Sequence, residues 1–244
     1  MTLPNPDFHI VIPARFDSKR FPGKPLALIN GKPMIQHVYE VALCTEAKSI
    51  TIATDSPRIV EACEDFEAQC LLTDQWCETG TDRVAQVCEK LGWERDTIVV
   101  NLQGDEPLMP PDLISQVAGT LAYYDGNDCE IATLFTYSED IYNPNHVKVV
   151  TDEYGVAMYF SRCPIPHGAK KIKRHIGLYA YRVGFLLDFV KMVKCGLENT
   201  EQLEQLRAMY HGAKIRVDEA MVVPGPDVNA PEDVEEVIKG LKSA

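Results

Sequence analysis

Apolar residues along the first 120 positions alternate between short continuous runs and segments in which they recur every three or four residues. Four short runs are typical of strands: 8–13, 49–53, 69–72 and 97–102. Three segments with the longer period predict helices: 33–44, 57–66 and 81–91. Alternation of this kind predicts an α/β fold, with a mostly parallel central sheet that is flanked by helices.

The pattern changes after position 120. Three strand-like segments follow at short spacing: 130–135, 147–150 and 156–160. The remaining segments predict helices at 182–193, 202–210 and 231–241, and a strand at 214–217. Since no repeat or linker interrupts the chain, we expect one domain over 1–244, with a sheet-and-helix part at about 8–122 and a smaller, inserted β-rich lobe at about 130–218.

Composition and charge narrow the class of protein. The formal net charge is −12, which argues against non-specific binding to nucleic acid or to an anionic membrane. No apolar run approaches the ~20 residues that span a bilayer. Positions 1–7 lack the basic start and apolar stretch of a secretory signal, so we expect a cytoplasmic protein without membrane insertion. The eight cysteines show no Cys-x-x-Cys or zinc-like spacing and are interpreted as reduced thiols.

Ligands of open α/β sheets bind beyond the carboxyl ends of the strands, which directs attention to the polar segment 14–24 after the first predicted strand. It carries four cations within ten residues: Arg15, Lys19, Arg20 and Lys24. Cations and backbone N–H groups in such a loop can surround a polyphosphate. The loop is not a P-loop, because Lys24 is followed by proline. A solvated basic loop would explain any one lysine, but the cluster favours an anion site.

Two more segments lie where a nucleotide site is expected. Gln103-Gly104-Asp105-Glu106-Pro107 follows a strand, and Asp105 suits a Mg²⁺ ion that keeps several waters and bridges phosphate oxygens. Thr79-Gly80-Thr81-Asp82-Arg83 begins a predicted helix, where free N–H groups favour an anion. An ordinary acidic turn and simple helix capping are the alternatives. Together with the basic loop, the segments favour a site for a nucleoside triphosphate.

Three later segments combine polar and aromatic groups. Tyr159-Phe160-Ser161-Arg162 ends a strand with a cation, and Leu203-Glu204-Gln205-Leu206-Arg207 presents a carboxylate and an amide on a helix. The alternation in 174–182 places His175, Gly177, Tyr179 and Tyr181 on one face. Packing and a solvated helix face are the ordinary interpretations, and a concave site for a hydroxylated acid is the alternative.

These motifs, in this order and almost from end to end, resemble those of the 3-deoxy-manno-octulosonate (Kdo) cytidylyltransferases, or CMP-Kdo synthetases. The matching segments also include Ala53-Thr54-Asp55 and Pro231-Glu232-Asp233. The resemblance implies a nucleotide-diphospho-sugar transferase fold and a homodimer. It also implies that CMP is transferred from CTP to the anomeric hydroxyl of Kdo, an acidic eight-carbon sugar, with release of pyrophosphate, for lipopolysaccharide synthesis.

The resemblance also implies residue roles. The catalytic residues would be Arg15, Lys24 and Asp105, with Mg²⁺ as cofactor at Asp105. The nucleotide would contact Ala14, Arg15, Arg20, Lys24, Thr79, Gly80, Arg83 and Gln103. The sugar acid would contact Arg162, His175, Tyr179, Glu204 and Gln205. In this assignment, 8–122 is the nucleotide-binding part, and 130–218 serves sugar binding and dimerisation.

Two departures from the family pattern leave alternatives open. Asn229 stands where the family usually has an aspartate as second metal ligand, and Asp227 is the alternative ligand after a local shift. The segment 166–175 is short and basic, which leaves 8-amino-3,8-dideoxy-octulosonate as an alternative to Kdo. Rival substrates are sialic or pseudaminic acids. A rival of another class is a nucleotide-sugar binding protein without turnover, and Asn229 is the feature that motivates it.

Overall fold

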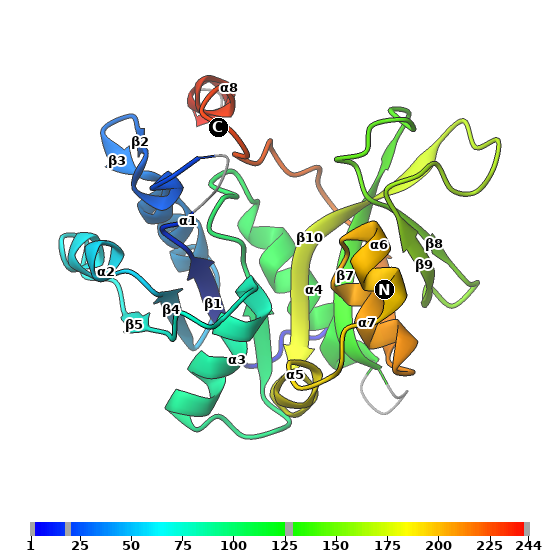
Figure 1. Ribbon diagram of the computed structural model, residues 1–244, viewed down its shortest axis with the longest axis horizontal. Coiled ribbons are helices and arrows are strands. Elements are labelled where there is room, and N and C mark those ends of the chain that lie inside the picture. The colour runs from blue at the N-terminus through cyan, green and yellow to red at the C-terminus, as the bar shows by residue number, and fades with distance from the viewer. Residues whose placement is uncertain (1–2, 18–20, 125–128, 242–244) are drawn as a thin grey trace.

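A computed structural model describes residues 3–17, 21–124 and 129–241 (Figure 1). Within these residues, one nine-stranded sheet runs through the molecule, and helices cover both of its faces. The strands are β1 (Phe8–Ala14), β4 (Ser49–Thr54), β5 (Cys70–Leu72), β6 (Ile98–Asn101), β7 (Cys129–Ser138), β8 (Lys148–Thr151), β9 (Ala157–Ser161), β10 (Ile172–Arg182) and β11 (Lys214–Glu219). The short strands β2 (Leu28–Ile29) and β3 (Lys32–Pro33) pair with each other.

The main sheet is mixed, in the order β11-β7-β10-β6-β1-β4-β5. Strands β6, β1, β4 and β5 are parallel neighbours, and so are β11 and β7. The long strand β10 is antiparallel to both β6 and β7. This arrangement confirms the expected α/β fold with a mostly parallel sheet, and it sends the carboxyl ends of β1, β4 and β6 to one edge.

The helices bury two separate apolar layers. They are α1 (Met34–Leu43), α2 (Pro57–Glu64), α3 (Gly80–Leu91), α4 (Pro111–Tyr123), α5 (Val183–Phe189), α6 (Gly196–Glu201), α7 (Gln205–Tyr210) and α8 (Asp233–Leu241), with a 3-10 turn η1 at Lys24–Leu26. Helices α1, α2 and α4 pack on one face of the sheet, and α3, α5 and α7 on the other. The continuous apolar runs of β1 and β6 are explained by this burial on both faces.

Helix α3 shows how the sequence sets local structure near the carboxyl ends of the strands. The Thr79 hydroxyl accepts from the Asp82 N–H at 3.1 Å, and the Asp82 carboxylate accepts from the Thr79 N–H at 2.9 Å. This reciprocal pair satisfies two N–H groups that the first turn leaves without helical partners. The helix ends at Leu91 and is capped by Gly92, whose φ of 65° lies in the left-handed region.

The expected β-rich lobe continues the main sheet. The hairpin of β8 and β9 is hydrogen-bonded to β10 through Lys173 and Arg174, and it projects from one end of the molecule (Figure 1). The register between β10 and β7 shifts between Ile176 and Tyr179, which marks a bulge. Bulges bend and twist a strand, so β10 can serve both the main sheet and the projecting hairpin.

After β11 the chain returns across the sheet to α8, beside β2 and β3 (Figure 1). Val228 is fully buried and joins Ile29, Met34 and Val237 in a small apolar cluster. This anchoring holds the segment 225–230 against the loops that follow β1 and β6. In the part of the chain that the structure describes, every helix is too short or too polar to cross a bilayer.

Candidate active site

A cavity of about 780 Å³ opens at the carboxyl ends of β1 and β6 and at the first turn of α3. Every predicted nucleotide-binding residue that the structure describes lines it: Ala14, Arg15, Lys24, Thr79, Gly80, Arg83 and Gln103. Asp105 lies on the same wall. Arg20, together with Lys19, lies outside the described residues. The volume is within the range of about 300–1,000 Å³ that is typical of small-molecule sites.

Two glycines let the three loops meet at this cavity. A Cβ atom at Gly104 would lie 2.7 Å from the carbonyl oxygen of Pro13, so no larger residue fits without a backbone shift. A Cβ atom at Gly80 would lie 3.1 Å from the Pro13 ring and 3.4 Å from the Gln103 amide oxygen. The close packing of the loops explains why both positions carry glycine.

The Lys24 ammonium and the Asp105 carboxylate form an ion pair of 2.6 Å on the cavity wall. The ammonium also donates to the Val228 carbonyl at 3.0 Å, and the Val228 N–H donates to the Asp105 carbonyl at 2.9 Å. These bonds link Lys24, the predicted phosphate-binding cation, and Asp105, the predicted metal ligand, to the C-terminal segment at Val228. Arg15 is exposed on the same wall, where a cation can contact an incoming anion.

Carboxyl groups gather behind this ion pair. The Asp227 carboxylate accepts from the Asn229 amide at 2.6 Å, so the two candidate metal ligands of the C-terminal segment contact each other. The Glu106 Oε2 atom is buried without a hydrogen-bond partner among the described groups. Burial, followed by the charges of Asp105 and Asp227, raises the pKa of Glu106 well above its usual value. The carboxyl groups of Asp105, Glu106 and Asp227 therefore lie close enough to influence one another.

This donor set fits a hard cation such as Mg²⁺. Its oxygens are carboxylate and amide oxygens, and Mg²⁺ is usually held by one or two carboxylates, waters and substrate phosphates. Across the described ranges, no three His, Cys, Asp or Glu side chains are arranged to hold a metal ion by themselves. The protein ligands alone would therefore leave most coordination positions to phosphate and water.

Arg83 is held from behind the cavity wall. Its side chain is 2% exposed, and its guanidinium donates to the Asp55 carboxylate at 2.6 Å and to the Thr73 hydroxyl at 2.7 Å. Further bonds reach the carbonyl groups of Asp74 and Cys77. The predicted nucleotide contact therefore also fixes the loop 73–77 against α3.

A second, smaller cavity of about 60 Å³ adjoins the first and shares Gln103 with it. Its wall includes three of the predicted sugar-binding residues: Tyr179, Glu204 and Gln205. The Glu204 carboxylate accepts from the Thr79 hydroxyl at 3.1 Å, from the Thr81 hydroxyl at 2.6 Å and from the Arg207 guanidinium at 2.7 Å. Burial raises the pKa of Glu204, while these donors oppose the shift.

His175 supplies an uncharged ring next to the small cavity. Its Nε2 atom lies 3.0 Å from the Thr133 hydroxyl, and its ring contacts those of Phe160 and Tyr179. Burial lowers the pKa of His175 to about 3, so the ring is neutral at physiological pH. The Tyr179 hydroxyl is buried without a hydrogen-bond partner among the described groups.

His175 lines neither cavity, and neither does Arg162. Its guanidinium donates to the carbonyl groups of Pro144, Glu201 and Gln202, at distances of 2.9 to 3.4 Å. Beneath it, the fully buried Lys148 donates to the Arg162 carbonyl at 2.8 Å. Lys148 gives no signal in the sequence, where it falls inside an ordinary strand pattern.

The fold and this site define a nucleotidyltransferase-like protein: cations, the Asp105 carboxylate and a cavity of nucleotide size meet at the carboxyl ends of parallel strands. A family model described as cytidylyltransferase matches residues 9–215. The chain is 50% identical to the 3-deoxy-manno-octulosonate cytidylyltransferase of Pseudomonas fluorescens strain SBW25, over 94% of this chain and 96% of the relative. It is also 50% identical to the enzyme of that name from Thioalkalivibrio sulfidiphilus, over 97% and 99%. The chain therefore belongs to the cytidylyltransferase family, among the 3-deoxy-manno-octulosonate cytidylyltransferases.

Solved structures agree with this assignment. A CMP:2-keto-3-deoxy-manno-octonic acid synthetase complexed with CTP superposes with a TM-score of 0.89 at 39% identity, covering 98% of this chain and 99% of the other. A 4-diphosphocytidyl-2C-methyl-D-erythritol synthase, at 11% identity and a TM-score of 0.63, shares the fold alone; the two chains are covered to 96% and 98%.

Proposed function

We propose that this protein transfers CMP from CTP to the anomeric hydroxyl of Kdo, giving CMP-Kdo for lipopolysaccharide synthesis and releasing pyrophosphate. One observation carries the proposal beyond family membership. A nucleotide-sized cavity with cations and a metal-type carboxylate adjoins a smaller cavity lined by the predicted sugar residues, and Gln103 belongs to both walls. Three of the predicted sugar-binding side chains therefore adjoin the nucleotide cavity.

The chain's own residues act mainly by position and charge. The sugar hydroxyl attacks the α-phosphorus of CTP in line and loses its proton to solvent as the new P–O bond forms. The bond to the β-phosphate breaks, and its electron pair leaves with pyrophosphate. Such transfers need alignment and cations near the phosphoryl oxygens. Arg15 and Lys24 line the cavity where the triphosphate would lie. When the triphosphate binds, Lys24 exchanges its present contact with Asp105 for a phosphate oxygen.

We propose Mg²⁺ as the cofactor, held by Asp105 together with Asp227 or Asn229. The closeness of the Asp105, Glu106 and Asp227 carboxyl groups and the contact between Asp227 and Asn229 support this donor set. When bound, the ion supplies positive charge to the phosphate oxygens. Asn229 offers a neutral oxygen, so Asp227 is the residue here that can replace the charge of the usual aspartate.

The sugar acid is proposed to bind beside Glu204, Gln205, Tyr179 and His175. Glu204 can accept from sugar hydroxyl groups, and the neutral His175 ring, which packs against Tyr179 behind this wall, adds no charge there. For Arg162 to contact the sugar carboxylate, its guanidinium must give up carbonyl partners that it now holds.

Ordinary Kdo is preferred over the 8-amino sugar. Cations lie at the end of the short loop before β10 and at the start of that strand: the Lys171 Nζ atom lies 4.1 Å from the centre of the Tyr137 ring, and the Nζ atom of Lys173 in β10 lies 4.7 Å from the centre of the Phe135 ring. A substrate ammonium gains nothing from such neighbours. The joint presence of Arg15, Lys24 and Asp105 on one cavity wall favours turnover over mere nucleotide-sugar binding.

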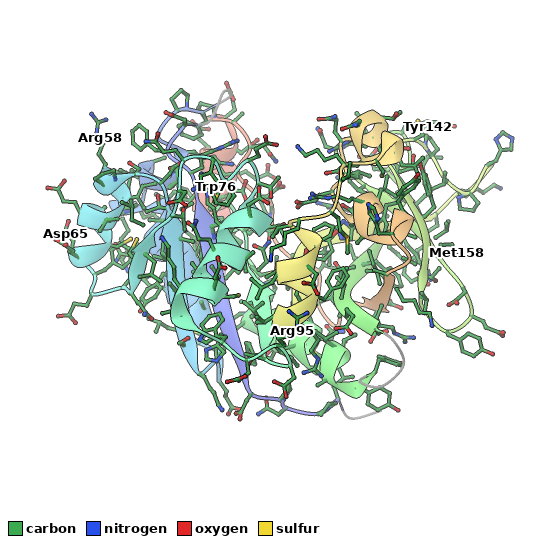
Figure 2. The ribbon with its side chains drawn as sticks, turned by 60° about the horizontal axis from the view of Figure 1, so that its bottom comes forward. Arg58, Asp65, Trp76, Arg95, Tyr142 and Met158 are labelled. Carbon is green, nitrogen blue, oxygen red and sulfur yellow. The ribbon has the colours of Figure 1, made fainter. Side chains whose placement is uncertain are left out.

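We further propose a cytoplasmic homodimer that does not bind nucleic acid. Tyr142 and Met158, which are 79% and 64% exposed, lie on the outer side of the β8–β9 half of the molecule (Figure 2). Arg58 and Asp65 mark the opposite end. Exposed apolar side chains such as Tyr142 and Met158 are candidates for the contact between the two subunits. Light scattering should give twice the mass of one chain.

The proposed substrate is tested by pyrophosphate release from CTP and Mg²⁺ with Kdo, 8-amino-Kdo and N-acetylneuraminate in separate reactions. Release with Kdo, at a kcat/KM well above that of the other two, is expected. Faster release with the amino sugar would reassign the substrate. CTP binding without release from any of the three would favour the binding-protein alternative.

A further inference from the structure

The hydroxyl of Thr81 joins two parts of the chain that are 123 residues apart. It donates to the Glu204 Oε2 atom at 2.6 Å, and Tyr181 lies beside it in the lining of the small cavity. Thr81 is 4% exposed, so water does not readily replace this bond. The capping of α3 does not explain the contact, because Thr79 and Asp82 already form the capping pair.

The Glu204 carboxylate accepts hydrogen bonds from residues that line each of the two cavities. Its other oxygen, Oε1, accepts from the Thr79 hydroxyl, which lines the nucleotide cavity, and from Arg207 on α7. Thr79 still accepts from Asp82, so its hydroxyl both accepts and donates. One carboxylate, which itself lines the small cavity, is therefore bonded to the first turn of α3 at two points.

The first turn of α3 borders both cavities. Thr79 and Gly80 line the large one, while Thr81 lines the small one together with Glu204 and Tyr181. A nucleotide that settles against Thr79 and Gly80 fixes this turn, and the bonds from Thr81 and Thr79 then fix the Glu204 carboxylate. Buried bonds to a charged group are stronger and more directional than bonds between neutral groups.

We propose that Thr81 is a positioning residue that couples the nucleotide site to the sugar-acid site by orienting the Glu204 carboxylate. The inference rests on the proposed function. Binding of CTP restricts the first turn of α3, so the sugar site is ordered before the acid arrives and the acid binds more tightly. By linkage, the acid tightens CTP binding by the same factor.

Calorimetric titration with an octulosonate that lacks the anomeric hydroxyl measures this coupling, because such a sugar cannot react. Its affinity is measured with and without CTP and Mg²⁺ in the wild type, in Thr81→Val, which keeps the shape without the hydroxyl, and in Thr81→Ser, which keeps the hydroxyl. CTP raises the affinity for the sugar by some factor in the wild type. In Thr81→Val we expect this factor to be about tenfold smaller, which equals about 1.4 kcal/mol. Thr81→Ser should keep most of it, and CTP affinity without sugar should change less than about twofold.

Steady-state kinetics separate positioning from structure. In Thr81→Val the KM for Kdo should rise about tenfold, whereas kcat should fall less and Thr81→Ser should restore the KM. Equal CTP-induced tightening in all three proteins, or equal losses in both variants, would overturn the coupling. If Thr81→Val does not bind CTP on its own, Thr81→Ala serves in the same comparison.

Failure of the coupling can be told apart from failure of the proposed function. A wild type that turns over Kdo, with a Thr81→Val variant that retains full coupling, contradicts only the role of Thr81. A wild type that neither binds nor turns over an octulosonate contradicts the proposed function and the coupling together.

Discussion

The replacement of Arg83 by methionine tests how the nucleotide loop is held. Arg83 is almost fully buried, and its guanidinium donates to the Asp55 carboxylate at 2.6 Å and to the Thr73 hydroxyl at 2.7 Å. Methionine fills a similar volume but offers no donor. The Asp55 carboxylate, which is 17% exposed, would then face an apolar side chain without its cation.

The expected cost follows from this burial. Removing one partner of a buried ion pair costs about 3–5 kcal/mol, and the partial exposure of Asp55 points to about 3 kcal/mol. Asp55→Asn keeps an acceptor oxygen but leaves the Arg83 guanidinium, whose side chain is 2% exposed, without its counter-charge, so it should also cost about 3 kcal/mol. The double variant removes both charges, so its cost should be about 4 rather than 6 kcal/mol, a coupling of about 2 kcal/mol.

Urea denaturation in the presence of a reductant measures these values, with fluorescence and circular dichroism compared to check for a single transition. With a slope of roughly 2–3 kcal/mol per molar urea, Arg83→Met should lower the midpoint by about 1–1.5 M. Arg95→Met is the matched control, because its pair with Asp188 is exposed and should cost below about 1 kcal/mol. A coupling between Arg83 and Asp55 below about 0.5 kcal/mol would refute the reasoning.

Three further outcomes are expected. Asp105→Ala should lower kcat at least about 10³-fold. The circular dichroism spectrum should stay native, because the Asp105 side chain lies on a loop beside Lys24. Near-normal turnover would remove Asp105 from the metal role. The folded pKa of His175 is depressed to about 3, so the unfolded chain binds this proton first and stability is lost as pH falls from about 6.5 towards 3, by about 2 kcal/mol at pH 5. His175→Gln should lack this part of the slope in denaturation at several pH values, and identical slopes would contradict the assignment. Asn229→Asp places a second carboxylate beside the Asp227 oxygen, which now lies 2.6 Å from the Asn229 amide nitrogen. Without divalent ions the melting temperature should therefore fall, and MgCl₂ should restore it. A variant that melts like wild type with and without MgCl₂ would contradict a metal at this pair.

Strands were predictable where apolar runs are continuous. The predicted strand 97–102 differs from β6 by one residue at each end, and its apolar run is continuous because both faces of β6 are covered. Helix ends were less predictable. The expected helix 182–193 ends at Phe189, because the apolar spacing continues into a turn in which Met192 bonds back to the Phe189 carbonyl. Periodicity in the sequence does not distinguish a turn from a helix.

The region around α6 shows a second limit. This six-residue helix has few apolar residues, so it gives no periodic signal, and Cys195 caps it with a thiol that accepts from the Glu198 N–H. Gln202, with a φ of 54°, separates it from α7, which therefore begins at Gln205 and not at 202 as expected. A left-handed residue other than glycine leaves little trace in a sequence.

The large cavity was predictable in outline, because parallel strands bring the loops after β1 and β6 to one edge. Contacts between distant segments were not. The bonds from Thr79 and Thr81 to Glu204, and the burial of Lys148 beneath Arg162, depend on how the sheet brings separate segments together. Residue types and spacing within a segment carry no information about such partners.

The transfer itself is tested most directly by the path of one oxygen atom. Kdo labelled with ¹⁸O at the anomeric hydroxyl is incubated with CTP and Mg²⁺, and the CMP-sugar is analysed by mass spectrometry. Attack by the sugar hydroxyl on the α-phosphorus predicts CMP-Kdo that keeps the label in the bridge between sugar and phosphate. An unlabelled bridge, or CTP consumption without any CMP-Kdo, would contradict the account.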